Sequence, residues 1–82
     1  MIPKITSIID RNEYKLEVHF DDGKQVIYDV SDDIKTIESF KDLINIPGLW
    51  EQFSLDQSRT CITWNDYIDI PSDTIYEYGV AI

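Results

Sequence analysis

Residues 60–76 constrain the fold of this chain more than any other stretch. Residues 60–64 (TCITW) predict a strand, residues 65–67 (NDY) a tight turn, and residues 68–70 (IDI) a returning strand. Ser72 follows a proline and precedes another apolar run, which predicts the capped start of a short terminal helix. This stretch therefore predicts a C-terminal hairpin that leads directly into a helix.

The first thirty residues predict a three-stranded meander. Residues 5–9 form a short apolar-rich segment, and residues 14–20 (YKLEVHF) alternate between apolar and polar side chains with the period of a half-buried strand. Gly23 lies in the polar group DDGK and tolerates the positive φ that a hairpin turn requires. The return strand is expected over residues 25–30.

A helical stretch is expected between the meander and the C-terminal hairpin. Apolar side chains recur about every third residue over residues 34–43, and Ser31 can cap the start. Thr36 and Ile37 lower the helix propensity, so the stretch suits either one helix or a pair of helical turns. Residues 45–48 (NIPG) end it, and residues 49–55 resume an apolar, strand-like pattern.

Together these segments predict one α+β domain over residues 1–82. We expect a small antiparallel sheet built from the meander and the hairpin, with one helical stretch between them and a short C-terminal helix. The single cysteine, Cys61, excludes a disulfide within one chain. Neither a signal peptide nor an apolar run of about 18 residues is visible, so we expect a cytoplasmic protein.

The charge of the chain is strongly acidic and unevenly distributed. The formal net charge is −9, and no lysine or arginine follows Arg59. Such a surface repels phosphate backbones and anionic lipids, which argues against binding to nucleic acids or membranes. It attracts a basic protein partner, although solubility alone also explains acidic surfaces.

The sequence offers no convincing catalytic, cofactor-binding or metal-binding residues, and we do not expect an enzyme. His19 has no orienting partner or nucleophile nearby in the sequence, and Cys61 fits a buried structural thiol. Asp66, Asp69 and Asp73 lack the dense spacing of a calcium loop. Small-molecule cofactors are not indicated, because the three glycines are isolated.

Aromatic residues in the last third of the chain suggest an interaction surface instead. Most should belong to the core, but a domain of this size cannot easily bury them all. Exposed tyrosines among carboxylates would form a binding patch. The candidate partner-binding residues are Asp66, Tyr67, Asp73, Glu77 and Tyr78. An open strand edge would also permit a homodimer.

The chain resembles the domain of unknown function 2442 family, which comprises small bacterial proteins. The resemblance covers nearly the whole length and rests on residues 3–5 (PKI), the hairpin residues 16–23, and Phe53 with Leu55. It is strongest over Ile62-x-Trp64 and over residues 69–76. A proline is usual in the family where Ser72 stands, and a glycine is common near Tyr67.

The resemblance implies structural roles for four residues and transfers no catalytic ones. Gly23, Trp64, Asp69 and Tyr76 match the shared motifs; Trp64 would anchor the core, and Asp69 would hold a turn or cap the last helix. The family's frequent pairing with another small protein suggests a toxin–antitoxin module. We therefore expect a non-enzymatic protein-interaction module, with an antitoxin that masks a small basic protein as one form of it. The alternative is a domain that senses or regulates through a small molecule.

Overall fold

Two antiparallel sheets form the framework of the protein in the computed structural model, which describes residues 2–82. The larger sheet has the order β1-β2-β3-β7 and the smaller sheet the order β4-β5-β6. Their strands are β1 (Ile5–Asp10), β2 (Lys15–Phe20), β3 (Gln25–Asp29), β4 (Ser54–Leu55), β5 (Cys61–Asn65), β6 (Ile68–Pro71) and β7 (Val80–Ala81). The α+β class, the meander and the C-terminal hairpin are confirmed, but meander and hairpin lie in two sheets instead of one.

The helical stretch after the meander is divided into short turns. It comprises α1 (Ser31–Thr36), the 3-10 turn η1 (Glu38–Lys41) and α2 (Asp42–Asn45). The interruption falls at Ile37, whose backbone is extended with φ −110° and ψ 117°. β-Branched residues at this point oppose a continuous helix. Ser31 does not cap α1 with its side chain, because the cap position is Val30.

The segment 49–55 is mostly not a strand, contrary to its apolar pattern. It forms the 3-10 turn η2 (Trp50–Gln52) and only two residues of β4. The tertiary structure explains the difference, because the segment buries Leu49 and Trp50 against the core instead of continuing a sheet. Strand β7 was not predicted; it adds two residues to the edge of β3.

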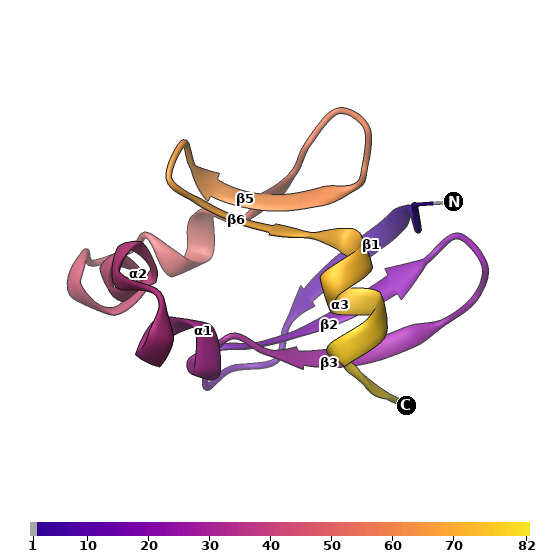
Figure 1. Ribbon diagram of the computed structural model, residues 1–82, viewed down its shortest axis with the longest axis horizontal. Coiled ribbons are helices and arrows are strands. Elements are labelled where there is room, and N and C mark those ends of the chain that lie inside the picture. The colour runs from indigo at the N-terminus through magenta and orange to yellow at the C-terminus, as the bar shows by residue number, and fades with distance from the viewer. Residues whose placement is uncertain (1) are drawn as a thin grey trace.

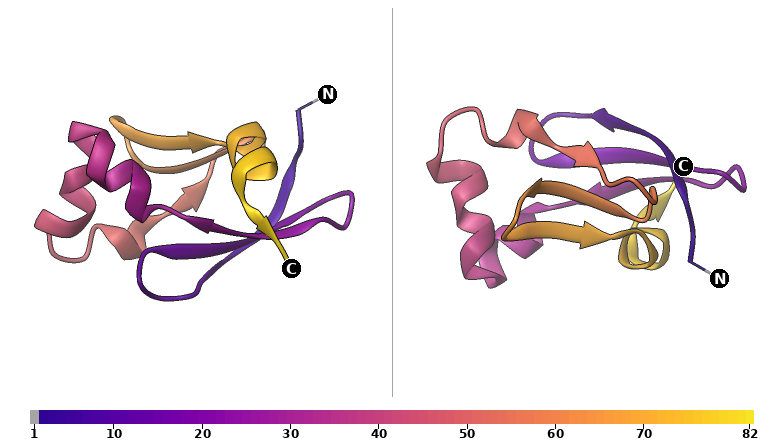
Figure 2. Two further views of the ribbon diagram at one scale, coloured as in Figure 1. Left: turned by 60° about the horizontal axis from the view of Figure 1, so that its bottom comes forward. Right: turned by 90° about the horizontal axis from the view of Figure 1, so that it is seen from above.

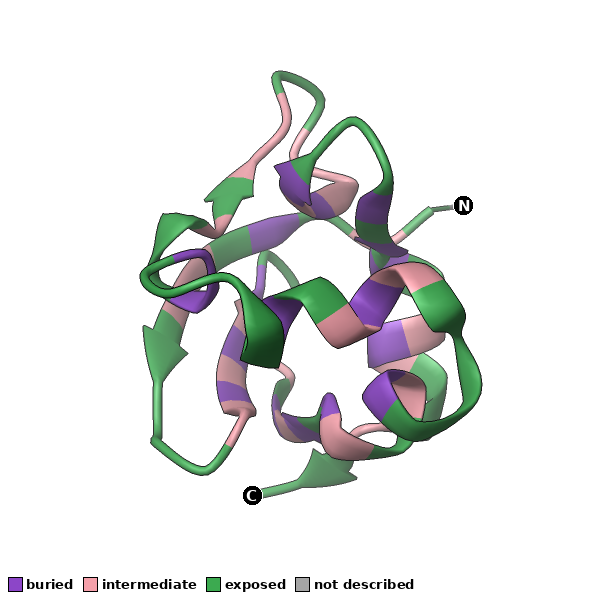
Figure 3. Cartoon of the chain, turned by 90° about the vertical axis from the view of Figure 1, so that its left-hand side faces the viewer, coloured by how far each residue is buried: buried purple, intermediate pink, exposed green. Residues whose placement is uncertain are grey.

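The core lies between the two sheets. Figure 1 shows the β5–β6 hairpin over the meander, with α1 and α2 near one end and α3 (Ser72–Tyr78) near the other; the views in Figure 2 agree. Buried residues alternate along β2, β5 and β6, as period-2 patterning requires, and Figure 3 shows this alternation. Each sheet therefore offers one apolar face to the other.

Helix α3 begins with a serine that serves a different role from the predicted one. Ser72 is fully buried, and its hydroxyl donates to the backbone oxygen of Pro3 at 2.6 Å. The N-cap is Pro71, without a side-chain cap. This hydrogen bond links the start of α3 to the segment before β1, so residues near the two ends of the sequence lie together.

Candidate functional site

The five predicted partner-binding residues do not form one patch. Asp66 and Tyr67 lie in the β5–β6 turn, whereas Asp73, Glu77 and Tyr78 lie on α3, at the other end of β6. All five are exposed, and the tyrosines strongly so, at 82% for Tyr67 and 72% for Tyr78. Of the five, Asp73 and Glu77 line a hollow in the surface.

That hollow, here called the α3 groove, has a volume of about 460 Å³. Three segments form it: the residues before β1, the β2–β3 turn and α3. Its lining residues are Ile2, Pro3, Lys4, Phe20, Asp21, Asp22, Asp73, Tyr76 and Glu77. Phe20 and Tyr76 meet edge to face with ring centroids 4.9 Å apart, which gives the groove an aromatic floor beneath its charged rim.

Most charges of the β2–β3 turn are already paired within the protein. Asp21 accepts two hydrogen bonds from the Arg59 guanidinium, each 2.8 Å long. These bonds, with one from Thr6, lower the pKa of Asp21 to about 2. Asp22 accepts a hydrogen bond from the Tyr76 hydroxyl at 2.5 Å, which lowers its pKa. The turn is thereby fixed against α3.

The cation of Lys24 is also engaged beside this groove. Its Nζ lies 4.0 Å from the centroid of the Tyr76 ring and donates to the Tyr76 backbone oxygen at 3.0 Å. Asp73 and Glu77, four residues apart on α3, face the groove with no ion pair among the described residues. Two like charges at this helical spacing repel each other. Lys4 lines the same groove.

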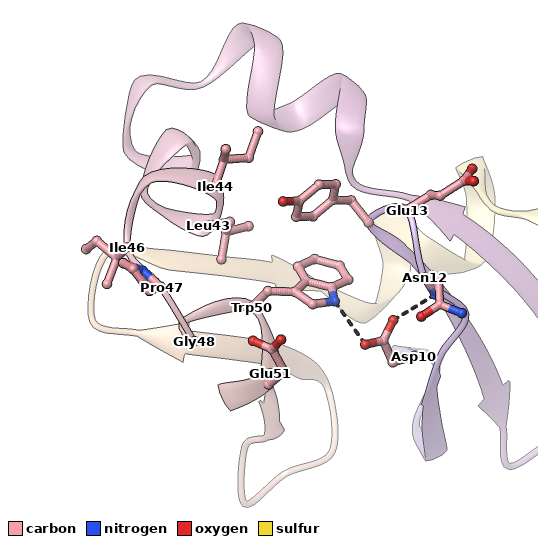
Figure 4. A pocket seen from close by; sticks show the side chains of 11 residues that line it. Asp10, Asn12, Glu13, Leu43, Ile44, Ile46, Pro47, Gly48, Trp50 and Glu51 are labelled. Carbon is pink, nitrogen blue, oxygen red and sulfur yellow. Dashed lines mark hydrogen bonds between the residues drawn. The ribbon is translucent and has the colours of Figure 1, made fainter.

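A second hollow, here called the Trp50 pocket, lies between the β1–β2 turn and the α2–η2 segment. It has a volume of about 340 Å³. Its lining residues are Asp10, Asn12, Glu13, Tyr14, Leu43, Ile44, Ile46, Pro47, Gly48, Trp50 and Glu51. As Figure 4 shows, the Trp50 indole points to Asp10, whose Oδ2 accepts its N–H at 3.1 Å. The other oxygen of Asp10 accepts the Asn12 N–H at 2.9 Å.

The β1–β2 turn that borders this pocket has an unusual backbone. Asn12, Glu13 and Tyr14 have φ values of 69°, 55° and 62°, in the left-handed region that glycine prefers. Such a conformation costs about 1–2 kcal/mol for each non-glycine residue. Tyr14 regains packing energy because its ring meets the Trp50 indole edge to face at a centroid distance of 5.1 Å. Glu13 is 84% exposed along its side chain and has no such packing.

The residues expected to be structural fall into two groups. Gly23 has φ +92° in the β2–β3 turn, and Trp64 is buried with its N–H donating to the Trp50 backbone oxygen at 3.0 Å. Tyr76 is half-buried and spans the α3 groove. Asp69 is an exposed residue of β6 and does not cap α3. The turn role predicted for it belongs to Asn65, whose Oδ1 accepts the N–H groups of Tyr67 and Ile68.

His19 and Cys61 are the two residues that the sequence raised as candidates for chemistry, and the structure shows their surroundings. The expectation that His19 has no orienting partner nearby is wrong, because its ring Nε2 lies 2.6 Å from a carboxylate oxygen of Glu17, on the same face of β2. Cys61 is half-buried, not fully buried as predicted. Burial, with the nearby charges of Asp69 and Asp56, raises the pKa of its thiol and disfavours the reactive thiolate.

Within residues 2–82, no three His, Cys, Asp or Glu side chains are grouped so that they could hold a metal ion. Over the same part of the chain, none of the helices has the length and apolar character needed to cross a membrane.

Sequence reasoning proposed two residues that line the α3 groove, Asp73 and Glu77, but did not predict the Trp50 pocket. Asp10 and Trp50 are forty positions apart and carry no shared motif. The β1–β2 turn also has no glycine and no Asn-Gly pair, the usual sequence signals of a left-handed turn. The only local signal was Asn12, a residue tolerant of that conformation.

The geometry defines a small α+β domain with two separate acidic hollows. The chain belongs to the family described as "Protein of unknown function (DUF2442)", which matches residues 5–81. The predicted family membership is therefore confirmed over nearly the whole chain. No curated protein and no solved structure matches it.

Proposed function

We propose that the protein is a non-enzymatic interaction module that binds a basic segment of a partner protein in the α3 groove. The observation that carries this proposal is the pair Asp73 and Glu77, which lie beside an aromatic floor and form no ion pair among the described residues. An apolar side chain flanked by lysine or arginine complements both features. An antitoxin that masks a small basic protein is one form of such a module.

The groove is preorganised for this purpose. Arg59 and Tyr76 hold the two aspartates of the β2–β3 turn, so the aromatic floor does not need to order on binding. The carboxylates of Asp73 and Glu77 are exposed on α3, where they can steer a cationic partner. Solvated rim charges each contribute about 0.2–1 kcal/mol to affinity, so a partner must also fill the apolar floor.

The test is a binding experiment on the tagged protein in a lysate of its host, at low and high salt. The double variant Asp73→Asn/Glu77→Gln removes the groove charges, and Asp32→Asn/Glu38→Gln makes the same charge change on α1 and η1. We expect one basic partner to be captured by the wild type and the control at low salt, and lost from the groove variant and at high salt. Equal capture by all three proteins would refute the proposal.

The alternative, a domain that senses a small molecule, is favoured by the Trp50 pocket. That hollow is separate from α3 and has the size of a small ligand site. A metabolite that raises the melting temperature while leaving the α3 groove unaffected would support this alternative.

A further inference from the structure

We infer that two copies of this chain associate through the free edge of β1, in an antiparallel and symmetric arrangement centred on Ile9. Strand β1 is an outer strand of the larger sheet and pairs with β2 on one side only. Figure 2 shows it in indigo at the border of the molecule. Ile9 does not line the α3 groove, so this interface is separate from the proposed site for a basic partner.

The backbone of β1 presents unpaired hydrogen-bonding groups on its outer side. The Arg11 N–H donates to the Lys15 backbone oxygen at 3.0 Å, and the register with β2 is uninterrupted from Ile8 to Asp10. Alternate residues of an antiparallel strand bond to opposite sides, so Ile9 and Arg11 face β2, whereas Ile8 and Asp10 face outward. Within residues 2–82, β2 is the only strand that pairs with β1. Ile8 and Asp10 therefore offer donors and acceptors to an incoming strand.

The outer strands of the two sheets differ in how well their edges are protected. Strands β4 and β7 have two residues each, and β6 ends in Pro71, which has no N–H. Strand β1 has six residues and contains neither lysine nor proline, the residues that commonly protect an edge. Only its start is covered, because the Ile5 N–H donates to the Arg59 backbone oxygen at 2.8 Å and a bulge falls between Ile5 and Ser7. Residues 7–10 thus form the longest open edge in the described part of the chain.

One symmetric register uses both outward residues. With Ile9 on the two-fold axis, Ile8 of one copy lies opposite Asp10 of the other, and the two residues exchange backbone hydrogen bonds. A register centred on Ile8 would instead require Thr6, which is unpaired at the bulge. The Ile9 side chain is 41% exposed, on the face of the sheet away from the core. The symmetric register places it against its own counterpart, as a β-branched pair across the new strand contact.

The charge around β1 favours a second copy over a basic partner. The chain carries a net charge of −9, but residues 4–11 contain Lys4 and Arg11 against Asp10 alone, which leaves one net positive charge. A basic segment gains no electrostatic attraction at this edge, and two such edges can approach each other without meeting the acidic surface directly. The overall repulsion between two acidic chains is screened by salt. Salt should therefore strengthen this association, whereas it should weaken the binding of a basic partner in the α3 groove.

The first test is analytical ultracentrifugation of the purified protein from about 1 μM to 1 mM, at ionic strengths of about 0.05 and 0.5 M. The variant Ile9→Lys places a charge at the centre of the edge, and Ile44→Lys makes the same change at a 54% exposed isoleucine of α2. Circular dichroism establishes that both variants are folded. We expect a reversible dimer for the wild type and the control, strengthened by salt, and a dissociation constant about tenfold or more higher for Ile9→Lys. A wild type that is monomeric at 1 mM and high salt, or equal losses in both variants, would overturn the inference.

The second test examines the register by disulfide cross-linking in a Cys61→Ser background, which removes the native thiol. Ile9→Cys should cross-link two copies under oxidised glutathione, because directly opposite residues have Cβ atoms about 4.5–5.5 Å apart. Ser7→Cys, two positions away on the same face, should not cross-link. Equal cross-linking of both variants, or of Ser7→Cys alone, would contradict the symmetric register. Protection of the Ile8 and Asp10 amides from hydrogen exchange only after another protein is added would identify a different occupant and would also overturn the inference.

Discussion

The two turns of the meander lie at opposite ends of β2. Both require a left-handed backbone conformation, but they place different residues in it. The β2–β3 turn places a glycine, Gly23, at its left-handed position, whereas the β1–β2 turn places Asn12, Glu13 and Tyr14 there. The first turn borders the α3 groove and the second borders the Trp50 pocket. The relaxed turn is therefore held by one ion pair and one hydrogen bond, and the strained turn is held by aromatic packing.

This difference shows that the protein tolerates an unfavourable backbone conformation in the β1–β2 turn, where aromatic packing compensates for it. Tyr14 offsets its strain by packing on Trp50, which itself stacks on Trp64 at a centroid distance of 5.6 Å. The β2–β3 turn needs no such support, because Arg59 and Tyr76 bind its aspartates. Substitutions in the two turns should consequently change stability in different directions.

The largest effect is expected from removing the packing beneath the strained turn. Trp50→Ala should lower the free energy of unfolding by about 3–5 kcal/mol, because it deletes a buried ring that Tyr14, Phe53 and Trp64 contact. Urea denaturation followed by circular dichroism measures this change. Tyr67→Ala, at an 82% exposed aromatic residue, is the control and should change stability little. A loss below about 1 kcal/mol for Trp50→Ala would contradict the packing explanation.

The next effect tests the relaxed turn. Gly23→Ala should destabilise the protein by about 1–2 kcal/mol, since the added Cβ forces a left-handed alanine. No heavy atom lies within 4 Å of that Cβ, so the cost is conformational and not a steric clash. The denaturation midpoint of the variant, compared with that of the wild type, measures this change. An unchanged midpoint would show that the turn accommodates alanine without loss of stability.

The opposite sign is expected at the strained turn. Glu13→Gly should stabilise the protein by about 0.5 kcal/mol, because the strain that it relieves exceeds the entropy that glycine adds to the unfolded chain. Glu51→Gly, in η2 on the other side of the pocket, relieves no left-handed strain and should destabilise. Thermal melts of the two variants compare them directly. Destabilisation by both would mean that Glu13 makes a favourable interaction with the folded chain.

The smallest expected effect is on the dependence of stability on pH in acidic solution. The folded-state pKa of Asp21, about 2, lies below its ordinary value of 3.8, so its ion pair with Arg59 stabilises the protein above about pH 4. This contribution is lost as the pH falls from about 4 towards 2. Asp21→Asn should reduce the slope of stability against pH in this window, measured by urea denaturation of the variant and the wild type. Equal slopes for Asp21→Asn and the wild type would remove the ion pair as the support of this turn.

Local patterns in the sequence predicted the strands of the meander and of the C-terminal hairpin, the glycine turn and the terminal helix. The period-2 alternation of residues 14–20 and the turn residues around Gly23 act over a few positions, and the structure confirms both. The charge of α3 was equally visible, because Asp73 and Glu77 are neighbours on one helix. Family membership was predicted for the same reason, from motifs that are continuous in the sequence.

Contacts between distant segments decided the rest. The apolar run 49–55 became η2 and a two-residue strand because Trp50 packs on Tyr14 and Trp64, which come from other elements. The Trp50 pocket joins Asp10 to a residue forty positions away. Ser72 serves as a tie to Pro3 instead of a helix cap. The sequence by itself determined the elements and the acidic charge, since these depend on neighbouring residues. Only the tertiary structure decided the two sheets and the two hollows, since burial and long-range hydrogen bonds override local preference.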